Sequence, residues 1–134
     1  MRTILIDFDG VIHSYVSEWQ GKTTIPDPPI PGAITALKDY VRHPNIRPAI
    51  WTSRVHCGEN EDPNLAEHAK QAIRAWLIKY GMTVAEVDQI PITNSKPPAT
   101  LIVDDRAFSF RGDFPTPWFV ERFEPWKFSA GENS

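Results

Sequence analysis

Cysteine is almost absent from this sequence, because Cys57 is the only one among 134 residues. No intrachain disulfide can form, so the cysteine usage gives no reason to expect an oxidising compartment. No apolar run is long enough to cross a bilayer, and the first residues lack the basic segment and apolar core of a signal peptide. We therefore expect a cytoplasmic protein without a membrane segment.

An excess of positive charge is also missing, since 14 Lys and Arg against 17 Asp and Glu give a net charge of -3. This balance argues against a general electrostatic nucleic-acid binder, although it allows a local basic patch. The length suits one domain with a real core, and hydrophobic residues at 41% are ordinary for a globular protein. We expect a single domain over residues 1–134.

The most informative stretch runs from Thr3 to Gly10 and reads TILIDFDG. Residues 4–6 are a short apolar run that indicates a strand buried on both faces, as in a parallel sheet. Asp7 and Asp9 follow two residues apart, so an extended chain points both carboxylates the same way. Burying two acids is costly unless a cation or hydrogen-bond donors compensate, so this pair indicates either a functional site or a turn in which both acids accept from backbone amides.

Apolar runs predict further strands, and their flanking residues predict the helices between them. We expect strands at 47–51, 90–93, 101–103 and 118–120, with Pro91 placing the third at an edge. Prolines, apolar periodicity and Gly81 predict helices over 31–43 and 62–80. Residues 11–29 lack a period and suggest a loop or small hairpin, and the tail with Phe123, Trp126 and Phe128 is expected to pack across the surface or against a partner subunit.

Strands separated by helices predict an α/β fold with a parallel sheet and right-handed crossovers. In such sheets the ligand crevice lies beyond the carboxyl ends of the strands. Polar residues follow several predicted strands at that edge: Thr52, Ser53 and Arg54, then Lys96, then Asp104, Asp105 and Arg106. If the first and fourth strands are neighbours, Asp7 and Asp9 converge with Asp104 and Asp105.

These residues match a known family in order along nearly the whole chain. The chain resembles the haloacid dehalogenase (HAD) superfamily of aspartate-nucleophile phosphatases. Residues 7–11 look like its first motif, 50–52 its second, Lys96 its third and 102–105 its fourth. The resemblance implies a three-layer, Rossmann-like parallel sheet of order 3-2-1-4-5. It also implies a small member without a substantial cap domain, in which residues 11–30 form at most a small flap.

The resemblance also implies residue roles for phosphomonoester hydrolysis. Asp7 would be the nucleophile that forms an aspartyl-phosphate, and we expect it to be ionised already at neutral pH. Asp9 would be general acid and then general base, so it must be able to hold a proton. Thr52 and Lys96 would complete the catalytic set. The implied phosphate-binding residues are Phe8, Asp9, Thr52, Ser53 and Lys96.

Magnesium is the cofactor that the resemblance implies, because oxygen-only ligands beside a phosphate suit this ion. The implied ligands are the Asp7 and Asp104 carboxylates and the Asp9 carbonyl, with Asp105 in support. The absence of a cap suggests a large phosphorylated substrate, such as a nucleic-acid end or phosphoprotein, or a small molecule enclosed by another subunit of a homodimer.

Three residues are candidates for substrate binding, namely His13, Arg54 and Arg106. Each has a structural alternative: a salt bridge for either arginine, and a hydrogen-bonded loop position for His13. Other functions also stay open. The same motifs occur with phosphotransferases and dehalogenases, although Asp9 and the metal-site acids fit a dehalogenase less well. A non-catalytic phosphate or nucleic-acid-end binder of the same fold is a further alternative.

Overall fold

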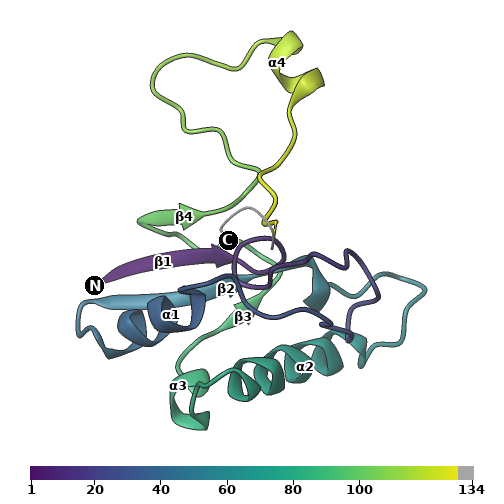
Figure 1. Cartoon of the computed structure of the whole chain (residues 1–134), viewed down its shortest axis with the longest axis vertical. Helices are drawn as coiled ribbons and strands as arrows, with labels where there is room; N and C mark the ends of the chain where they lie inside the picture. The colour runs from purple at the N-terminus through teal and green to yellow at the C-terminus, as the bar shows by residue number, and fades with distance from the viewer. Residues whose placement is uncertain (130–134) are drawn as a thin grey trace.

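The sheet is the centre of the computed structural model, which describes residues 1–129 (Figure 1). It contains β1 (Arg2–Asp7), β2 (Ile46–Trp51), β3 (Ile92–Thr93) and β4 (Leu101–Val103) in the order β3-β2-β1-β4. All neighbouring strands are parallel. The predicted α/β class, the edge position of the third strand and the pairing of the first strand with the fourth are therefore confirmed.

Three helices cover one face of this sheet. These are α1 (Ala33–Arg42), α2 (Leu65–Lys79) and α3 (Val84–Asp88). Their buried side chains share one core cluster with Ile4, Ile6 and Ile50, whereas Leu5 between them is fully buried but lies outside that cluster. Because successive side chains of a strand alternate in direction, the three helices lie on the same face and Leu5 points to the other.

The opposite face carries a loop instead of a helix. The connection from β3 to β4 is only residues 94–100, and the Thr100 N–H donates to the Thr3 carbonyl at 2.9 Å. Pro97 and Pro98 line the same groove as Thr3 and Ala49, which face away from the helices. Parallel strands usually need a crossover of about a dozen residues or more. Among residues 1–129, the expected third layer is thus replaced by this short proline-containing segment.

The predicted fifth strand at 118–120 is wrong, because these residues belong to the helix α4 (Pro117–Arg122). Thr116 caps this helix by accepting from the Phe119 N–H at 3.1 Å, and Pro117 occupies its first turn. These are ordinary helix-start signals that the apolar triplet 118–120 obscured. The helix α3 was also not predicted, although Thr83 and Glu86 form a capping box that marks its start.

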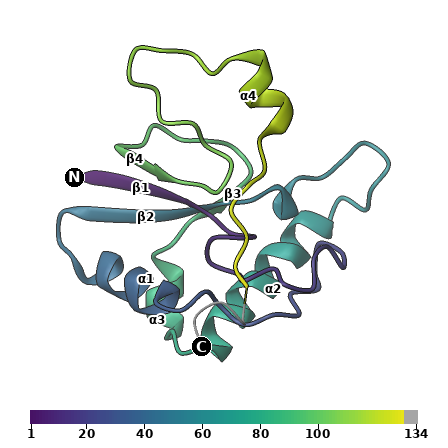
Figure 2. The same cartoon turned by 45° about the horizontal axis from the view of Figure 1, so that its top comes forward.

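The chain after β4 forms an arm that leaves the sheet. Figures 1 and 2 both show it extending through α4 and then returning toward the carboxyl end of β1. Its exposed large apolar side chains are Phe108, Phe110, Phe114, Trp118, Phe119, Val120, Phe123 and Trp126. Within residues 1–129, no helix has both the length and the apolar character needed to cross a membrane.

Burial in the core predicts which position of α2 loses most stability when its side chain is shortened. Ile73 is fully buried, whereas Ile78 on the same helix is 39% exposed. We expect Ile73→Ala to lower the free energy of unfolding by about 2–5 kcal/mol, because it leaves a cavity. Ile78→Ala is the matched control and should cost clearly less. Urea unfolding followed by circular dichroism measures both, and equal losses would contradict this assignment of the buried face.

Candidate active site

Three carboxylates meet at the carboxyl ends of β1 and β4. Asp7 is the last residue of β1, while Asp104 and Asp105 directly follow β4, whose Val103 is paired with Ile6. One oxygen from each of the three lies within 4.8 Å of the others, an arrangement that could hold a metal ion. The predicted convergence of these acids is therefore present, and it follows from the parallel pairing of the two strands.

Gly10 allows Asp105 to approach the first motif. Its φ of +87° lies in the region that favours glycine, and a Cβ there would come within 2.7 Å of the Asp105 carboxylate oxygen Oδ2. The Gly10 N–H also donates to the His13 carbonyl at 2.8 Å, which closes the turn after β1. A larger residue at position 10 would therefore displace one of the three acids.

Asp7 has the most perturbed carboxyl group of the site. Burial, a hydrogen bond with Asp105 and the charges of Asp104 and Asp105 together raise the pKa of Asp7 to about 8. Without a cation, Asp7 is thus mainly protonated at neutral pH, contrary to the expectation of a ready-made carboxylate. The sequence could not reveal this, since the shift arises from neighbours that are distant in the chain.

The donor set fits a hard divalent cation. All three groups offer carboxylate oxygens, and the buried Oδ1 of Asp105 has no hydrogen-bond partner among the described residues. Clustered like charges and an unpaired buried oxygen are both relieved by a cation with oxygen ligands. Magnesium matches this chemistry, and its identity as the ion is taken up below as a proposal.

Asp9 is held differently from the three acids. Arg54 donates to both of its oxygens, from Nε to Oδ2 at 2.8 Å and from Nη2 to Oδ1 at 3.0 Å, and His13 Nδ1 lies 2.8 Å from Oδ1. Burial alone would raise the pKa of Asp9, but the hydrogen bonds from His13 and Arg54 outweigh it and lower the pKa. The structure therefore holds Asp9 as a carboxylate.

Arg54 is fully buried, so it is not presented to a substrate. Besides the two bonds to Asp9, its Nη1 donates to the carbonyls of Gly21, Lys22 and Thr24 at 2.9–3.0 Å. The substrate-binding assignment of Arg54 is corrected by these contacts, because every guanidinium nitrogen is engaged within the protein. The salt-bridge alternative describes it better, although its partner is Asp9 rather than an acid after β4.

His13 is buried as well and joins Asp9 to the following loop. Its Nε2 accepts from the Asp27 N–H at 3.2 Å, which assigns the ring hydrogen to Nδ1 and makes the ring a donor to Asp9. Contact with a substrate is thus not available to His13, and its hydrogen-bonded alternative applies. Lys22 also pairs with Glu61 at 2.5 Å, so residues 11–30 are tied to the body of the protein at several points.

The second motif contributes Thr52 and Ser53, which both line the same cleft as Asp7. The Thr52 side chain is buried, and its Oγ1 accepts from the Arg54 N–H at 3.2 Å. Within residues 1–129 the Thr52 hydroxyl hydrogen has no acceptor, so it is available to donate, whereas Ser53 is exposed. These two residues are therefore brought to the carboxylates as the sequence predicted.

Two other expected residues do not present their side chains to the carboxylates. The Phe8 side chain is fully buried on the helix side, where its ring lies edge-on to Trp76, so only its backbone can serve a phosphate. Lys96 is exposed, and its Nζ lies 4.6 Å from the centroid of the Trp51 ring. Trp51 itself lines the cleft, which places Lys96 at the periphery of the site.

The cleft beside the carboxylates has a volume of about 1000 Å³. Its lining includes residues 14–19 and the returning arm, residues 125–129. Arg106 is exposed and also lines the cleft, while its N–H donates to Asp104 Oδ1 at 2.9 Å. Sequence reasoning did not assign the arm to the site, because residues so far along the chain carry no local signal of where they fold back.

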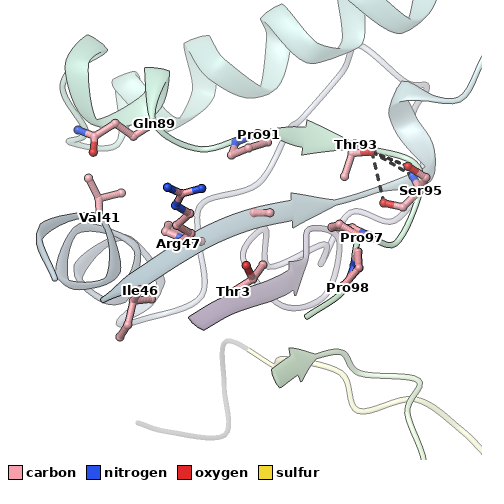
Figure 3. Close-up of a pocket in the computed structure, with 12 residues that line it drawn as sticks. Thr3, Val41, Ile46, Arg47, Gln89, Pro91, Thr93, Ser95, Pro97 and Pro98 are labelled. Carbon is pink, nitrogen blue, oxygen red and sulfur yellow. Dashed lines mark hydrogen bonds between the residues drawn. The ribbon is translucent and has the colours of Figure 1, made fainter. Parts of the chain in front are cut away.

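A second groove lies beside β2, where β3 is too short to cover it (Figure 3). Its volume is about 650 Å³, and Figure 3 shows Thr93 hydrogen-bonded to Ser95 at the start of the crossover segment. Arg47 is the one charged residue in its lining, and no carboxylate contributes to it. The cleft beside Asp7 is therefore the candidate active site, because it alone of the two combines acids with a volume for a ligand.

Comparisons with protein-family models and with curated proteins give no match to this sequence. The resemblance to the HAD superfamily accordingly stays a prediction from the motifs.

The raised pKa of Asp7 predicts a pH dependence of stability in the absence of metal. Between about pH 4 and pH 8 the unfolded chain loses the Asp7 proton while the folded protein keeps it, so stability falls as pH rises. In chelator, the melting temperature of the wild type should decline more steeply from pH 5 to pH 8 than that of Asp7→Asn. Differential scanning calorimetry measures both, and parallel declines would contradict the assignment.

Proposed function

We propose that the protein is a Mg²⁺-dependent phosphomonoester hydrolase of the HAD superfamily that acts through an aspartyl-phosphate on Asp7. The observation that carries this proposal is the cluster of Asp7, Asp104 and Asp105, with a buried carboxylate oxygen lacking a partner among the described residues, at the end of a cleft. Two neighbouring strands of a parallel sheet deliver these acids to the edge at which such sheets bind ligands.

The chemistry divides between two aspartates. An Asp7 oxygen attacks phosphorus while the ester oxygen leaves with its electron pair, and water then cleaves the resulting acyl phosphate to release phosphate and restore Asp7. Mg²⁺ held by Asp7, Asp104 and Asp105, with the Asp9 carbonyl, would supply the positive charge that keeps Asp7 ionised and offsets the phosphate charge. Asp7 must lose its proton before it attacks, because the protonated group is not a nucleophile.

Asp9 is suited to one of its two implied roles. Its hydrogen bonds favour the ionised form, which a general base acting on water in the second step must have, and the same bonds weaken its affinity for the proton. Protonation of the leaving oxygen in the first step requires Asp9 to carry a proton despite Arg54 and His13. We therefore propose that esters with acidic leaving groups react faster than alkyl esters. Thr52 and Ser53 would donate to phosphate oxygens, and Lys96 would reach the phosphate by leaving the Trp51 ring.

The proposal predicts metal-dependent turnover of an aryl phosphate. Purified protein should release phosphate with Mg²⁺, lose this activity in chelator, and lose at least about a thousandfold in kcat with Asp7→Asn, because the nucleophile is removed. Asp113→Asn on the exposed arm is the matched control and should retain activity. A metal-dependent activity that survives Asp7→Asn would overturn the mechanism. Binding of phosphate without turnover would instead favour the non-catalytic alternative, and transfer to an added alcohol the phosphotransferase.

We also propose that the protein forms a homodimer through its arm. The exposed aromatic side chains of residues 108–123 offer an apolar surface, and the charges between Arg106 and Lys127 are mixed, with four basic and three acidic residues. A surface with both signs of charge suits a second copy of the chain better than a polyanion. The cytoplasmic location stays a prediction.

The dimer proposal predicts a mass that depends on the arm. Phe110 and Phe114 contact each other, with ring centroids 5.0 Å apart, and both are exposed. The double variant Phe110→Ser, Phe114→Ser should shift the protein from dimer to monomer in sedimentation velocity, since it removes apolar contact area. The control Val84→Ser, on the exposed side of α3, should not. A wild-type monomer at all concentrations would overturn the proposal.

A further inference from the structure

The cleft beside the carboxylates is lined by an unusual number of aromatic side chains. Residues 14–19 contribute Tyr15 and Trp19, β2 contributes Trp51, and the returning arm contributes Trp126 and Phe128. The phosphoryl chemistry described above uses none of these rings. They line the same cleft as the acids, so they border the space that is available to the leaving group of a phosphate ester bound there.

Two of these rings have a cation over one face. The Arg54 guanidinium carbon lies 4.9 Å from the Trp19 ring centroid, and Lys96 Nζ lies 4.6 Å from that of Trp51. The Trp51 indole N–H also donates to the Asn94 carbonyl at 3.1 Å. Trp19 is still 49% exposed despite its contact with Arg54. Oriented aromatic rings that keep accessible surface are suited to stacking against a flat ligand.

Trp126, on the returning arm, also lines the cleft and is 56% exposed. Among the described residues, no aromatic ring or cation stacks on it. Next to it, Lys127 lines the cleft with its exposed side chain, and Arg106 does the same from the end of β4. The cleft thus combines aromatic faces with two exposed cations, beyond the groups needed to hold one phosphate.

We infer that the leaving group of the substrate carries a nucleobase, so that the cleft takes a nucleoside phosphate with its phosphate at Asp7 and its base stacked against Trp126. This inference rests on the proposed hydrolase function for the orientation of the ligand. Bases stack on aromatic side chains because every base has a flat π face. A sugar phosphate would leave the aromatic walls without a partner, and a volume of about 1000 Å³ accommodates a nucleotide.

The same chemistry is offered by a free mononucleotide and by the terminal nucleotide of an oligonucleotide. A net charge of -3 does not favour contact with a long stretch of backbone, so recognition is confined to the nucleotide in the cleft. Arg106 and Lys127 are placed to contact one further phosphate, either of a diphosphate or of the adjoining nucleotide.

The decisive experiment compares adenosine 5′-monophosphate with ribose 5-phosphate, which has the same ester bond but lacks the base. With Mg²⁺, kcat/KM should be at least about tenfold higher for the nucleotide. Trp126→Ala should raise KM for the nucleotide at least about fivefold, leave kcat nearly unchanged, and leave both parameters for ribose 5-phosphate unchanged. Val84→Ala is the control, because Val84 is exposed on α3, outside both the cleft lining and the arm.

A binding experiment separates this inference from the proposed reaction. Asp7→Asn protein with Mg²⁺ is titrated with the same two ligands by calorimetry, so that no turnover is needed. Tighter binding of the nucleotide, weakened by Trp126→Ala, supports the base site even where the wild type hydrolyses nothing. Equal affinity for both ligands, or equal loss of both with Trp126→Ala, overturns the base site even where the wild type is an active phosphatase.

A third experiment distinguishes a free mononucleotide from the end of an oligonucleotide as the ligand. Binding of a 5′-phosphorylated tetranucleotide and of adenosine 5′-monophosphate is compared by calorimetry with Mg²⁺, for Asp7→Asn protein with and without Lys127→Ala. Tighter binding of the tetranucleotide that depends on Lys127 supports the end of a strand as ligand. Tighter binding of the mononucleotide supports the free nucleotide. Failure of both to bind better than ribose 5-phosphate overturns the inference.

Discussion

The parallel pairing of β1 with β4 is the contact on which the site depends. It brings Asp7 beside Asp104 and Asp105, and mutual repulsion then makes full ionisation of the three acids unfavourable without a cation. A stable core alone would not select such an arrangement, because clustered acids cost free energy. The pKa of Asp7 is raised, and the buried Oδ1 of Asp105 has no hydrogen-bond partner among the described residues. A positive charge beside the three acids would relieve both.

A second constraint is the buried ion pair of Arg54 with Asp9. Breaking a buried pair by removing one partner typically costs about 3–5 kcal/mol, since it leaves a charge without a counterion. Here the same guanidinium also binds three carbonyls of residues 21–24, so one side chain ties the loop after β1 to the end of β2. The loop that lines the cleft is thereby anchored, and Asp9 is kept ionised near the cluster of Asp7, Asp104 and Asp105.

The short crossover between β3 and β4 explains why the molecule departs from a three-layer sandwich. A right-handed return across the sheet must pass over the face opposite α1 and α2. Residues 94–100 make that passage without a helix, and Pro97 and Pro98 cover part of the face instead. The chain after β4 then contributes no further strand within residues 1–129. It extends as an arm that returns toward the carboxyl end of β1 (Figure 2). On this returning part, Trp126 lines the cleft.

The sequence by itself determined the α/β class, the two long helices, the four strands and the convergence of Asp7 with Asp104 and Asp105, because these follow from local periodicity and from where parallel strands end. It wrongly placed the Asp9 carboxylate with these three acids, because Arg54 and His13 bind it instead. It misassigned residues 118–120, where Thr116 and Pro117 outweigh a strand-like triplet. Only the tertiary structure decided that Arg54 forms an ion pair with Asp9 and that Lys96 Nζ lies over the Trp51 ring. It also decided that the pKa of Asp7 is raised and that the returning arm lines the cleft. Each of these depends on contacts between segments that are distant in the chain, and local sequence patterns do not reveal which distant segments come together.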